Sequence, residues 1–409
     1  LADTDNPFNE PYAWGPSADP SGGTPGRVNS TVMAVPDTRC PRVIAIWPLA
    51  TDTIAVLFDE TIMLADREPW LADGISTLPS LSGDHIDRTA LVPLTEPPSP
   101  SAIITLLIPL QITDFAGNPP CFTELKTGLP SDPLSGELLF NELMPDPPEG
   151  YSEYLEIYNN SEKVIDMSRL FLASGSSSVA NSVTGIPRQI LPGGYIALTT
   201  GKEEFGEYYP CADDDAVFRA DRLPVLQDDR GTMILYDRSL NIIDRVDYHS
   251  GMHLLLLSGT KGVALEKVSP SLASDVPGNW HSATETCNWG SPGARNPASI
   301  EKPGEDEDMT LSSRRISPDG DGFEDVVLIG VFPGGEDNII SVTVFNDRGY
   351  PVRRLAERFY AGNGAHFIWD GLADNSVRLP AGLYLILAES YNNAGTSRRW
   401  KEVCALLYR

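Results

Sequence analysis

The stretch Gly136–Asn160, GELLFNELMPDPPEGYSEYLEIYNN, decides the fold of this chain. It holds two short runs in which apolar and polar residues alternate, at 138–142 and 154–158, and a loop rich in Pro, Gly and Asp divides them. Alternation with a period of two is typical of a half-buried strand, and such a loop is typical of a tight connection. The stretch therefore predicts two half-buried strands that begin an all-β domain.

The composition extends this prediction to the whole chain. At 409 residues the chain is expected to form about three or four domains, because single cores stop growing beyond roughly 250 residues. Gly and Pro number 35 each, and this density of turn-forming residues favours many short strands over long helices. We expect serial β-sandwiches throughout.

Charge argues against nucleic-acid partners, and hydropathy argues against a membrane-spanning segment. The net charge of −27 argues against nucleic acid, because binding to phosphates depends on clustered Lys and Arg. The longest apolar run, Ile103–Ile112, is too short for a membrane-spanning helix, so no transmembrane segment is expected. The chain begins at Leu1 without a basic and then apolar leader, which indicates either a removed signal peptide or a piece of a longer protein.

The five cysteines permit one disulfide in each of two domains. Cys40 and Cys121 lie at the two ends of one predicted domain, Cys211 and Cys287 lie inside the next, and Cys404 is left over. Because connectivity cannot be deduced from sequence, five buried thiols remain the alternative.

The region 136–297 resembles the lamin-tail domain, an immunoglobulin-like sandwich. The resemblance begins at Asn141, Glu142 and Pro145 and continues through Glu153–Asn159, with Tyr154 in place of the usual Trp. It then follows the family order through further motifs, at 166–170, 191–195, 231–235, 241–248 and 265–268. The resemblance implies one lamin-tail domain over 136–297.

A possible repeat links the N-terminus to the end of this region. The segment Trp14–Ser30 parallels Trp280–Asn296: both have Trp, a small polar spacer and then [ST]-P-G-x-x-N. In lamin-tail domains such a string closes the fold, so residues 1–38 are expected to be the tail of a preceding lamin-tail-like domain. The alternatives are a linker and two similar Pro-Gly turns that arose by chance.

Residues 39–130 resemble a bacterial immunoglobulin-like domain, through Pro41, Val43 and Pro48 at its start and Asp114–Pro119 at its end. Strands are expected at 43–46, 53–58 and 102–110. Asp59 and Glu60 are interpreted as solvated acids at a strand-end turn, since adjacent strand residues point to opposite faces and do not form a paired acid/base site.

Residues 298–313 form an expected acidic linker, with the acid run at 305–308. Residues 314–409 resemble the C-terminal immunoglobulin-like module of flagellar-hook-cap-type and Bacteroidetes gliding-associated proteins, through Ser317–Asp325, Val344–Leu355, Trp369–Gly371 and Pro380–Leu387. In the Bacteroidetes proteins such modules serve as type IX secretion signals, and the resemblance implies that role here.

One constellation suggests a ligand. Asp319, Asp321 and Asp325 surround Gly320 and Gly322, and a loop interrupted by Gly can wrap carboxylates around one Ca²⁺. The spacing is not that of an EF-hand. The alternative is an acidic turn whose Asp side chains bond their own backbone.

No catalytic motif is present, and the chain is not expected to be an enzyme. These features predict a non-catalytic structural or adhesive region of an exported cell-surface protein, on the outer face of the outer membrane, with extracellular protein or glycan partners. The first alternative is an accessory region of an extracellular nuclease or phosphoesterase whose catalytic domain lies upstream. The second is a glycan-binding module, which would need Tyr208, Tyr209 and Trp289 exposed on one face.

Overall fold

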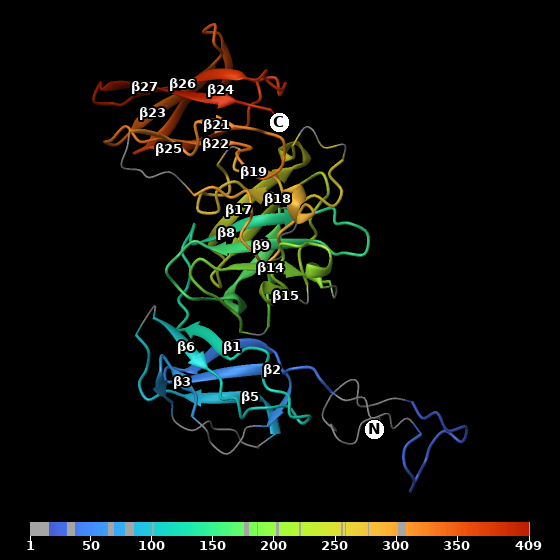
Figure 1. The fold of residues 1–409 in the computed structure, drawn as a ribbon. Helices are drawn as coiled ribbons and strands as arrows, with labels where there is room; N and C mark the ends of the chain where they lie inside the picture. The colour runs from blue at the N-terminus through green and yellow to red at the C-terminus, as the bar shows by residue number, and fades with distance from the viewer. Residues whose placement is uncertain are drawn as a thin grey trace. The chain divides into compact units, whose positions relative to one another are not determined.

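The computed structural model describes residues 16–30, 37–63, 69–77, 86–99, 102–175, 180–185, 187–201, 204–220, 222–254, 257, 259–276, 278–301 and 308–408. Trp14 and residues 305–307 of the acid run lie outside these residues. Within them every regular element is a strand or a 3-10 helix of three residues, so the all-β prediction is confirmed (Figure 1). No helix of the described residues is long and apolar enough to span a membrane.

The chain forms two compact units. The first comprises residues 1–132 together with two segments from the middle of the chain, 162–169 and 184–192. The second comprises 133–161, 170–183 and 193–409. Sequence order therefore does not separate the two units at a single point.

The first unit contains the first sandwich. One sheet has the order β1-β2-β5, from β1 (Val43–Ala50), β2 (Thr53–Met63) and β5 (Ile86–Pro93). The other has the order β4-β3-β6-β7, from β4 (Ile75–Ser76), β3 (Leu71–Ala72), β6 (Ile103–Leu107) and β7 (Glu124–Gly128). β2, β5 and β6 contribute to one apolar core that includes the fully buried Trp70. The inserted segments pair as β10 (Ile165–Asp166) and β13 (Gln189–Ile190), and η1 (Met167–Arg169) follows β10.

The second unit begins with the central sandwich, which has two sheets. The larger sheet has the order β15-β14-β9-β8-β18-β19. Its strands are β8 (Leu138–Met144), β9 (Tyr154–Asn159), β14 (Tyr195–Thr199), β15 (Val217–Arg219), β18 (Leu265–Lys267) and β19 (Trp280–Ser282). The smaller sheet has the order β12-β11-β16-β17, from β11 (Phe171–Ser174), β12 (Asn181–Ser182), β16 (Arg230–Tyr236) and β17 (Ile242–His249). The 3-10 helices η2 (Phe205–Glu207), η3 (Asp214–Ala216), η4 (Ser250–Met252) and η5 (Glu285–Cys287) lie in its loops.

The expectation of a half-buried first strand is wrong. The predicted pair exists as antiparallel β8 and β9, but every residue of β8 is buried. β8 lies between β9 and β18 in the interior of the sheet, so it has no free edge, and both of its faces are covered (Figure 1). Alternation in the sequence therefore does not mark a solvent-facing side here.

The terminal sandwich, residues 308–408, completes the second unit. One sheet is β20-β22-β25, from β20 (Met309–Leu311), β22 (Val327–Val331) and β25 (Ala365–Trp369). The other is β21-β27-β26-β23-β24, from β21 (Arg315–Ile316), β23 (Asn338–Phe345), β24 (Pro351–Gly362), β26 (Gly382–Tyr391) and β27 (Ser397–Leu406). Both sheets contribute to one core around Trp369.

The cysteines pair in the permitted way. Cys40 is bonded to Cys121 in the first unit, and Cys211 is bonded to Cys287 in the second. Cys404 is free and buried in β27. The proposed one-bridge-per-domain connectivity is confirmed, and the alternative of five thiols is wrong.

Candidate functional site

The predicted metal ligands lie in one loop between β21 and β22. We call Ser317–Asp325 the aspartate loop. One carboxylate oxygen from each of Asp319, Asp321 and Asp325 can be chosen so that all three lie within 4.8 Å of one another. Oxygens that each bind Ca²⁺ at about 2.4 Å can be separated by up to about this distance. The loop therefore gathers the three predicted ligands with a spacing that fits a hard cation.

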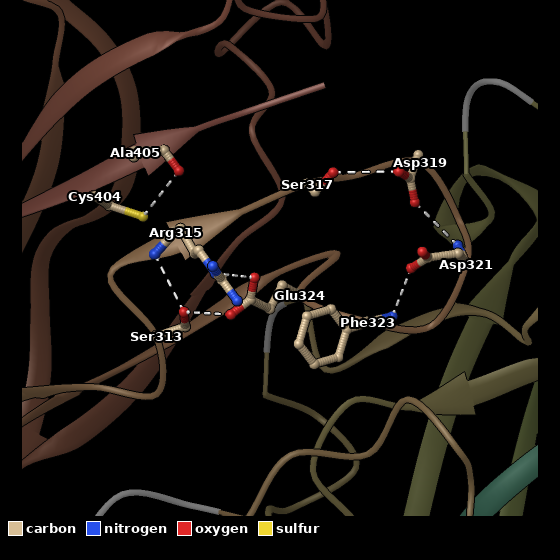
Figure 2. Close-up of polar contacts among 9 residues, drawn as sticks. All are labelled: Ser313, Arg315, Ser317, Asp319, Asp321, Phe323, Glu324, Cys404 and Ala405. Atoms are coloured by element: carbon tan, nitrogen blue, oxygen red, sulfur yellow. Dashed lines mark hydrogen bonds and ion pairs between the residues drawn. The ribbon is translucent and has the colours of Figure 1, made fainter. Parts of the chain in front are cut away.

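The same carboxylates also bind the loop's own backbone. Asp325 is buried and accepts from the N–H of Gly320 at 2.7 Å and of Gly322 at 2.9 Å. Figure 2 shows Asp321 accepting from the N–H of Phe323 at 2.8 Å, and Asp319 accepting from the N–H of Asp321 and from Ser317 Oγ. Burial, then the charges of Asp319 and Asp321, raise the pKa of Asp325. The metal site stays a prediction, because these bonds also fit the acidic turn.

Glu60 belongs to a second acidic group, which sequence reasoning missed. β2 continues through Glu60 to Met63, so this residue does not lie in a strand-end turn. Its carboxylate lies within 4.8 Å of those of Asp37 and Asp114, and burial, followed by the charge of Asp114, raises the pKa of Glu60 to about 7. Describing Glu60 as an ordinary solvated acid was therefore wrong.

The central sandwich holds a third group of three carboxylates, which sequence reasoning did not single out as a group. Glu142, Glu156 and Glu266 come from β8, β9 and β18, and Glu142 is the register partner of both others. We call these three residues the glutamate row. All three are 0% exposed, so no solvent-borne substrate can contact them. The row is therefore a structural feature of the sheet.

A turn near the end of the central sandwich closes over this row. We call Ser291–Asn296, sequence SPGARN, the closing turn. The N–H of Ser291 donates to Glu142 Oε1 at 3.0 Å, and the N–H of Gly293 donates to Glu156 Oε2 at 2.7 Å. Ser291 Oγ donates to Glu266 Oε1 at 2.9 Å. Each glutamate thus accepts at least one hydrogen bond from the closing turn.

Side chains from the strands complete the network. Asn141 Nδ2 donates to Glu156 Oε1 at 2.7 Å and to Asn296 Oδ1 at 2.6 Å. Tyr154 OH donates to Glu142 Oε1 at 2.6 Å, and Asn296 Nδ2 donates to the carbonyl oxygen of Lys267 at 3.0 Å. Four separate stretches of the lamin-tail resemblance therefore meet in one buried polar network.

Burial determines the charge state of the row. Desolvation raises the pKa of Glu142 to about 7, and it raises the pKa values of Glu156 and Glu266 well above the usual range, with the charge of Glu142 as the next cause. Like charges directly opposite each other on neighbouring strands repel. In addition, Glu266 Oε2 is buried without a hydrogen-bond partner among the described residues, which costs less in a neutral acid than in an anion. Burial therefore favours the protonated form of all three carboxyl groups.

The closing turn is anchored on its other side by the disulfide region. The N–H of Asp213 donates to the carbonyl oxygen of Pro292 at 3.0 Å, two residues from the Cys211–Cys287 bridge. Gly293 has φ +84°, and a Cβ at this position would lie 2.3 Å from the carbonyl oxygen of Asp213. Only glycine fits here, because both the backbone angle and the space exclude a side chain.

The aromatic face required for glycan binding does not form as expected. Tyr209 is completely buried in a core with Tyr154 and Phe205, and Tyr208 packs against that core while half-buried. Tyr208 and Tyr209 have centroids 4.9 Å apart in an edge-to-face arrangement. The glycan-binding alternative needs Tyr208, Tyr209 and Trp289 on one exposed face, and the buried Tyr209 does not meet this condition.

A comparison of sequence families identifies the centre of the chain. Residues 132–250 match the Lamin Tail Domain. The match includes Asn141, Glu142 and Glu153–Asn159, so the lamin-tail resemblance is confirmed for this part. It ends before β18, which pairs with β8 in the same sheet, and before the closing turn. No curated protein matches the chain.

Three solved structures with similar chains are remote in sequence and in overall superposition. Latent PorU from Porphyromonas gingivalis is 10% identical, with a TM-score of 0.20, over 88% of this chain and 32% of that one. The central fibronectin-III array of RIM-binding protein is 8% identical, with a TM-score of 0.19, over 89% and 96% of the two chains. SGBP-B from Bacteroides ovatus is 13% identical, with a TM-score of 0.19, over 84% and 69%. The chain spans about a third of the PorU chain.

Proposed function

We propose that this chain is a non-catalytic structural or adhesive region of an exported cell-surface protein. The observation that carries the proposal is the pair of disulfides, one in each unit. Disulfides form and persist in oxidising compartments and are rare in the cytosol. The serial β-sandwiches support the structural part of the proposal, since each sandwich has its own apolar core.

The titratable cluster of the lamin-tail sheet supports the non-catalytic part of the proposal. Three carboxylates with raised pKa values would suggest acid/base chemistry if they lined a cleft. In this chain they are sealed beneath the closing turn, and their hydrogen bonds go to backbone and side chains of the fold. Their hydrogen bonds join the closing turn to the sheet.

Thiol labelling in the producing cells tests the compartment. With an alkylating reagent added to cells before lysis, Cys40, Cys121, Cys211 and Cys287 are expected to stay unmodified until a reductant is added. Cys404 serves as the internal control, because it is a free thiol that becomes reactive only on unfolding. Recovery of the four other cysteines as thiols would contradict export of the chain.

Attachment assays separate the surface role from its rivals. Deletion of the region is expected to reduce attachment of cells to extracellular protein or glycan while leaving secreted nuclease and phosphoesterase activities unchanged. Loss of a hydrolase activity instead would favour an accessory region of an enzyme. Binding to a glycan array would favour the glycan-binding alternative.

We also propose that residues 314–409 act as a type IX secretion module and that the aspartate loop within them binds Ca²⁺. The loop's three carboxylates within 4.8 Å of one another support the metal proposal. Deletion of 314–409 in a type IX-secreting cell is expected to leave the remaining protein inside. Unchanged export of the deletion protein would contradict the secretion role.

A further inference from the structure

A row of apolar and aromatic side chains crosses one end of the terminal sandwich. Ile339 of β23 is the register partner of Tyr360 on β24 and of Tyr391 on β26. Direct partners on neighbouring antiparallel strands point to the same side of a sheet. Ile340, the next residue of β23, is completely buried in the core, so the three side chains point away from that core. We call Tyr360, Ile339 and Tyr391 the tyrosine row.

The two tyrosines of the row are not core residues. Tyr360 is 64% exposed and Tyr391 is 40% exposed, whereas Trp369 and Tyr384 of the same sandwich are buried. Aromatic side chains carry a large apolar surface, and they gain from burial whenever a partner covers them. The row therefore offers apolar rings to a ligand on the outer face of the sheet.

Hydrogen bonds hold the hydroxyl groups of both tyrosines. Tyr360 OH donates to Asp337 Oδ1 at 2.7 Å, and Arg358 Nη2 donates to Tyr391 OH at 3.3 Å. β23 lies between the strands of Arg358 and Tyr391, so the second contact runs across the sheet. A ring that is already held in place loses less conformational freedom when a ligand stacks on it. The row is therefore preorganised for binding.

A β-bulge directs Arg358 onto this face. The register between β23 and β24 shifts between Ile340 and Val342. Arg358 lies at this shift with φ +52°, and its N–H donates to Ser341 Oγ at 3.0 Å. Bulges redirect side chains and are frequent next to functional sites. Here the irregularity supplies the guanidinium group that holds Tyr391.

The charges beside the row are balanced. Glu389 and Arg399 are register partners on the same face and form an ion pair at 2.6 Å. Arg358 and Asp337, which hold the two tyrosines, add one charge of each sign. A polyanion or an anionic membrane surface is bound by an excess of Lys and Arg, and basic side chains do not outnumber acidic ones here. The charge pattern therefore fits a neutral ligand.

A neutral sugar chain has the chemistry that this face can recognise. Pyranose units with equatorial hydroxyls have apolar C–H faces, and these stack on aromatic rings because the face of a ring is partly negative. Their hydroxyl groups donate to carboxylates and accept from guanidinium groups. We propose that the tyrosine row binds a neutral polysaccharide of glucose-like or xylose-like units.

This binding site deepens the proposed adhesive role, on which it rests, by naming the chemical class of the extracellular partner. It lies on the terminal sandwich and not at Tyr208, Tyr209 and Trp289. Its three members come from three strands of one sheet.

Isothermal titration calorimetry of the purified full chain tests the proposal. The neutral probes are hydroxyethyl cellulose, a glucan, and arabinoxylan, and the acidic probe is polygalacturonate. The buffer contains EDTA, so that a cation at the aspartate loop makes no contribution. We expect wild type to bind at least one neutral probe and to bind polygalacturonate more weakly.

Single substitutions assign the binding to the row. Tyr360→Ala and Tyr391→Ala should each weaken it about tenfold or more, because both remove a ring that contacts the ligand. Tyr350→Ala is the matched control and should bind as wild type, since Tyr350 is 65% exposed but follows β23 at the end opposite Ile339. Tyr391→Phe keeps the ring and should retain most of the affinity. Melting temperatures within about 2 °C of wild type show that the variants are folded.

Four results would overturn the proposal. They are no binding of wild type to either neutral probe, tighter binding to polygalacturonate, equal binding by wild type and Tyr360→Ala, and a dimer in light scattering that Tyr360→Ala dissociates. The last result would assign the row to a second copy of the chain. Tyr360→Ala alone is decisive if Tyr391→Ala does not fold, because the Tyr360 side chain is mostly exposed.

The outcome is separable from that of the proposed function. Titration uses purified protein, so absence of binding would leave the disulfide argument for export unchanged. Thiol labelling that contradicts export would in turn leave a measured affinity for the polysaccharide in place.

Discussion

The glutamate row and the aspartate loop are both groups of three carboxylates, yet the fold uses them in different ways. The row takes one residue from each of three neighbouring strands and buries all of them. The loop takes three residues from a seven-residue stretch, of which only Asp325 is buried. The contrast shows that carboxylates buried within a sheet can only bond other groups of the fold. Carboxylates whose oxygens reach solvent can also bind a cation.

The energetic difference follows from desolvation. A buried carboxylate is stable when it is neutral or when hydrogen bonds replace its hydration, and the row has both a raised pKa and donors from the closing turn. In the aspartate loop, burial raises the pKa of Asp325. The following predictions test this contrast, from the largest expected effect to the smallest.

Disrupting the closing turn should give the largest loss of stability, and this loss should fall on the central sandwich. Gly293→Ala combines an unfavourable backbone angle with a contact of 2.3 Å, and we expect a loss of about 4 kcal/mol in the free energy of unfolding. Gly26→Ala is the matched control, because it has the same kind of angle but no neighbouring atom, and it should cost about 1 kcal/mol. Chemical denaturation measures both, and equal losses would show that the glutamate row gains nothing from the closing turn.

Removing one carboxylate from each group should give clearly different losses in the free energy of unfolding. Glu156→Ala leaves the buried donors Gly293 N–H and Asn141 Nδ2 without this acceptor, and we expect a loss of about 3 kcal/mol. Asp321→Ala removes a half-exposed side chain that bonds one local N–H, and in EDTA it should cost about 0.5 kcal/mol. Thermal melts of both variants provide the measurement. A larger loss in Asp321→Ala would reverse the comparison.

The row should also make stability depend on pH. The pKa of Glu142 is raised from 4.5 to about 7, so between these values the folded state binds more protons than the unfolded state and stability falls as pH rises. His253 and Lys267 change the free energy of unfolding in the opposite direction, because burial lowers their pKa values from 6.5 to about 4 and from 10.5 to about 7. Each therefore makes stability rise with pH between its two pKa values.

Comparison with Glu142→Gln isolates the glutamate, since the amide mimics the neutral acid at every pH. The stability of wild type relative to this variant should fall by on the order of 2 to 3 kcal/mol between pH 4.5 and 7, and stay level above. Denaturation midpoints measured across this range provide the check. A difference that does not change with pH would mean that Glu142 binds its proton equally well in the folded and unfolded states.

Calcium should give the smallest effect, and it should act only at the aspartate loop. Ca²⁺ at ten times its dissociation constant should stabilise the terminal sandwich by about 1.4 kcal/mol relative to EDTA, since a ligand that binds only the folded state stabilises it. The shift should vanish in Asp321→Ala and persist in Glu60→Gln, which alters the other acidic group. Superimposable melts of wild type with and without Ca²⁺ would leave the loop as an acidic turn.

Particular residues show where sequence reasoning succeeded and where it failed. Periodicity and turn residues predicted the strands at 43–46 and 53–58, which lie within β1 and β2, and the paired β8 and β9. The failures concern burial: Glu60 was expected to be solvated and the first strand half-buried, yet Glu60 is half-buried and every residue of β8 is buried. Glu142 and Glu156 did carry a signal, because each is an acid within a mostly apolar strand, in LLFNELM and YLEIYN, whereas the strand LEK around Glu266 carries none.

By itself the sequence determined the elements that depend on local chemistry. Proline, glycine and alternating apolar residues specify turns and strands through their own backbone preferences, and this is why SPGARN at 291–296 and TPGRVN at 24–29 form one turn in two unlike surroundings. Only the tertiary structure decided which residues the strands and turns bring together. The register of β9, β8 and β18 aligns three glutamates, and the closing turn removes them from water; both are non-local pairings, which no local pattern in the chain can encode.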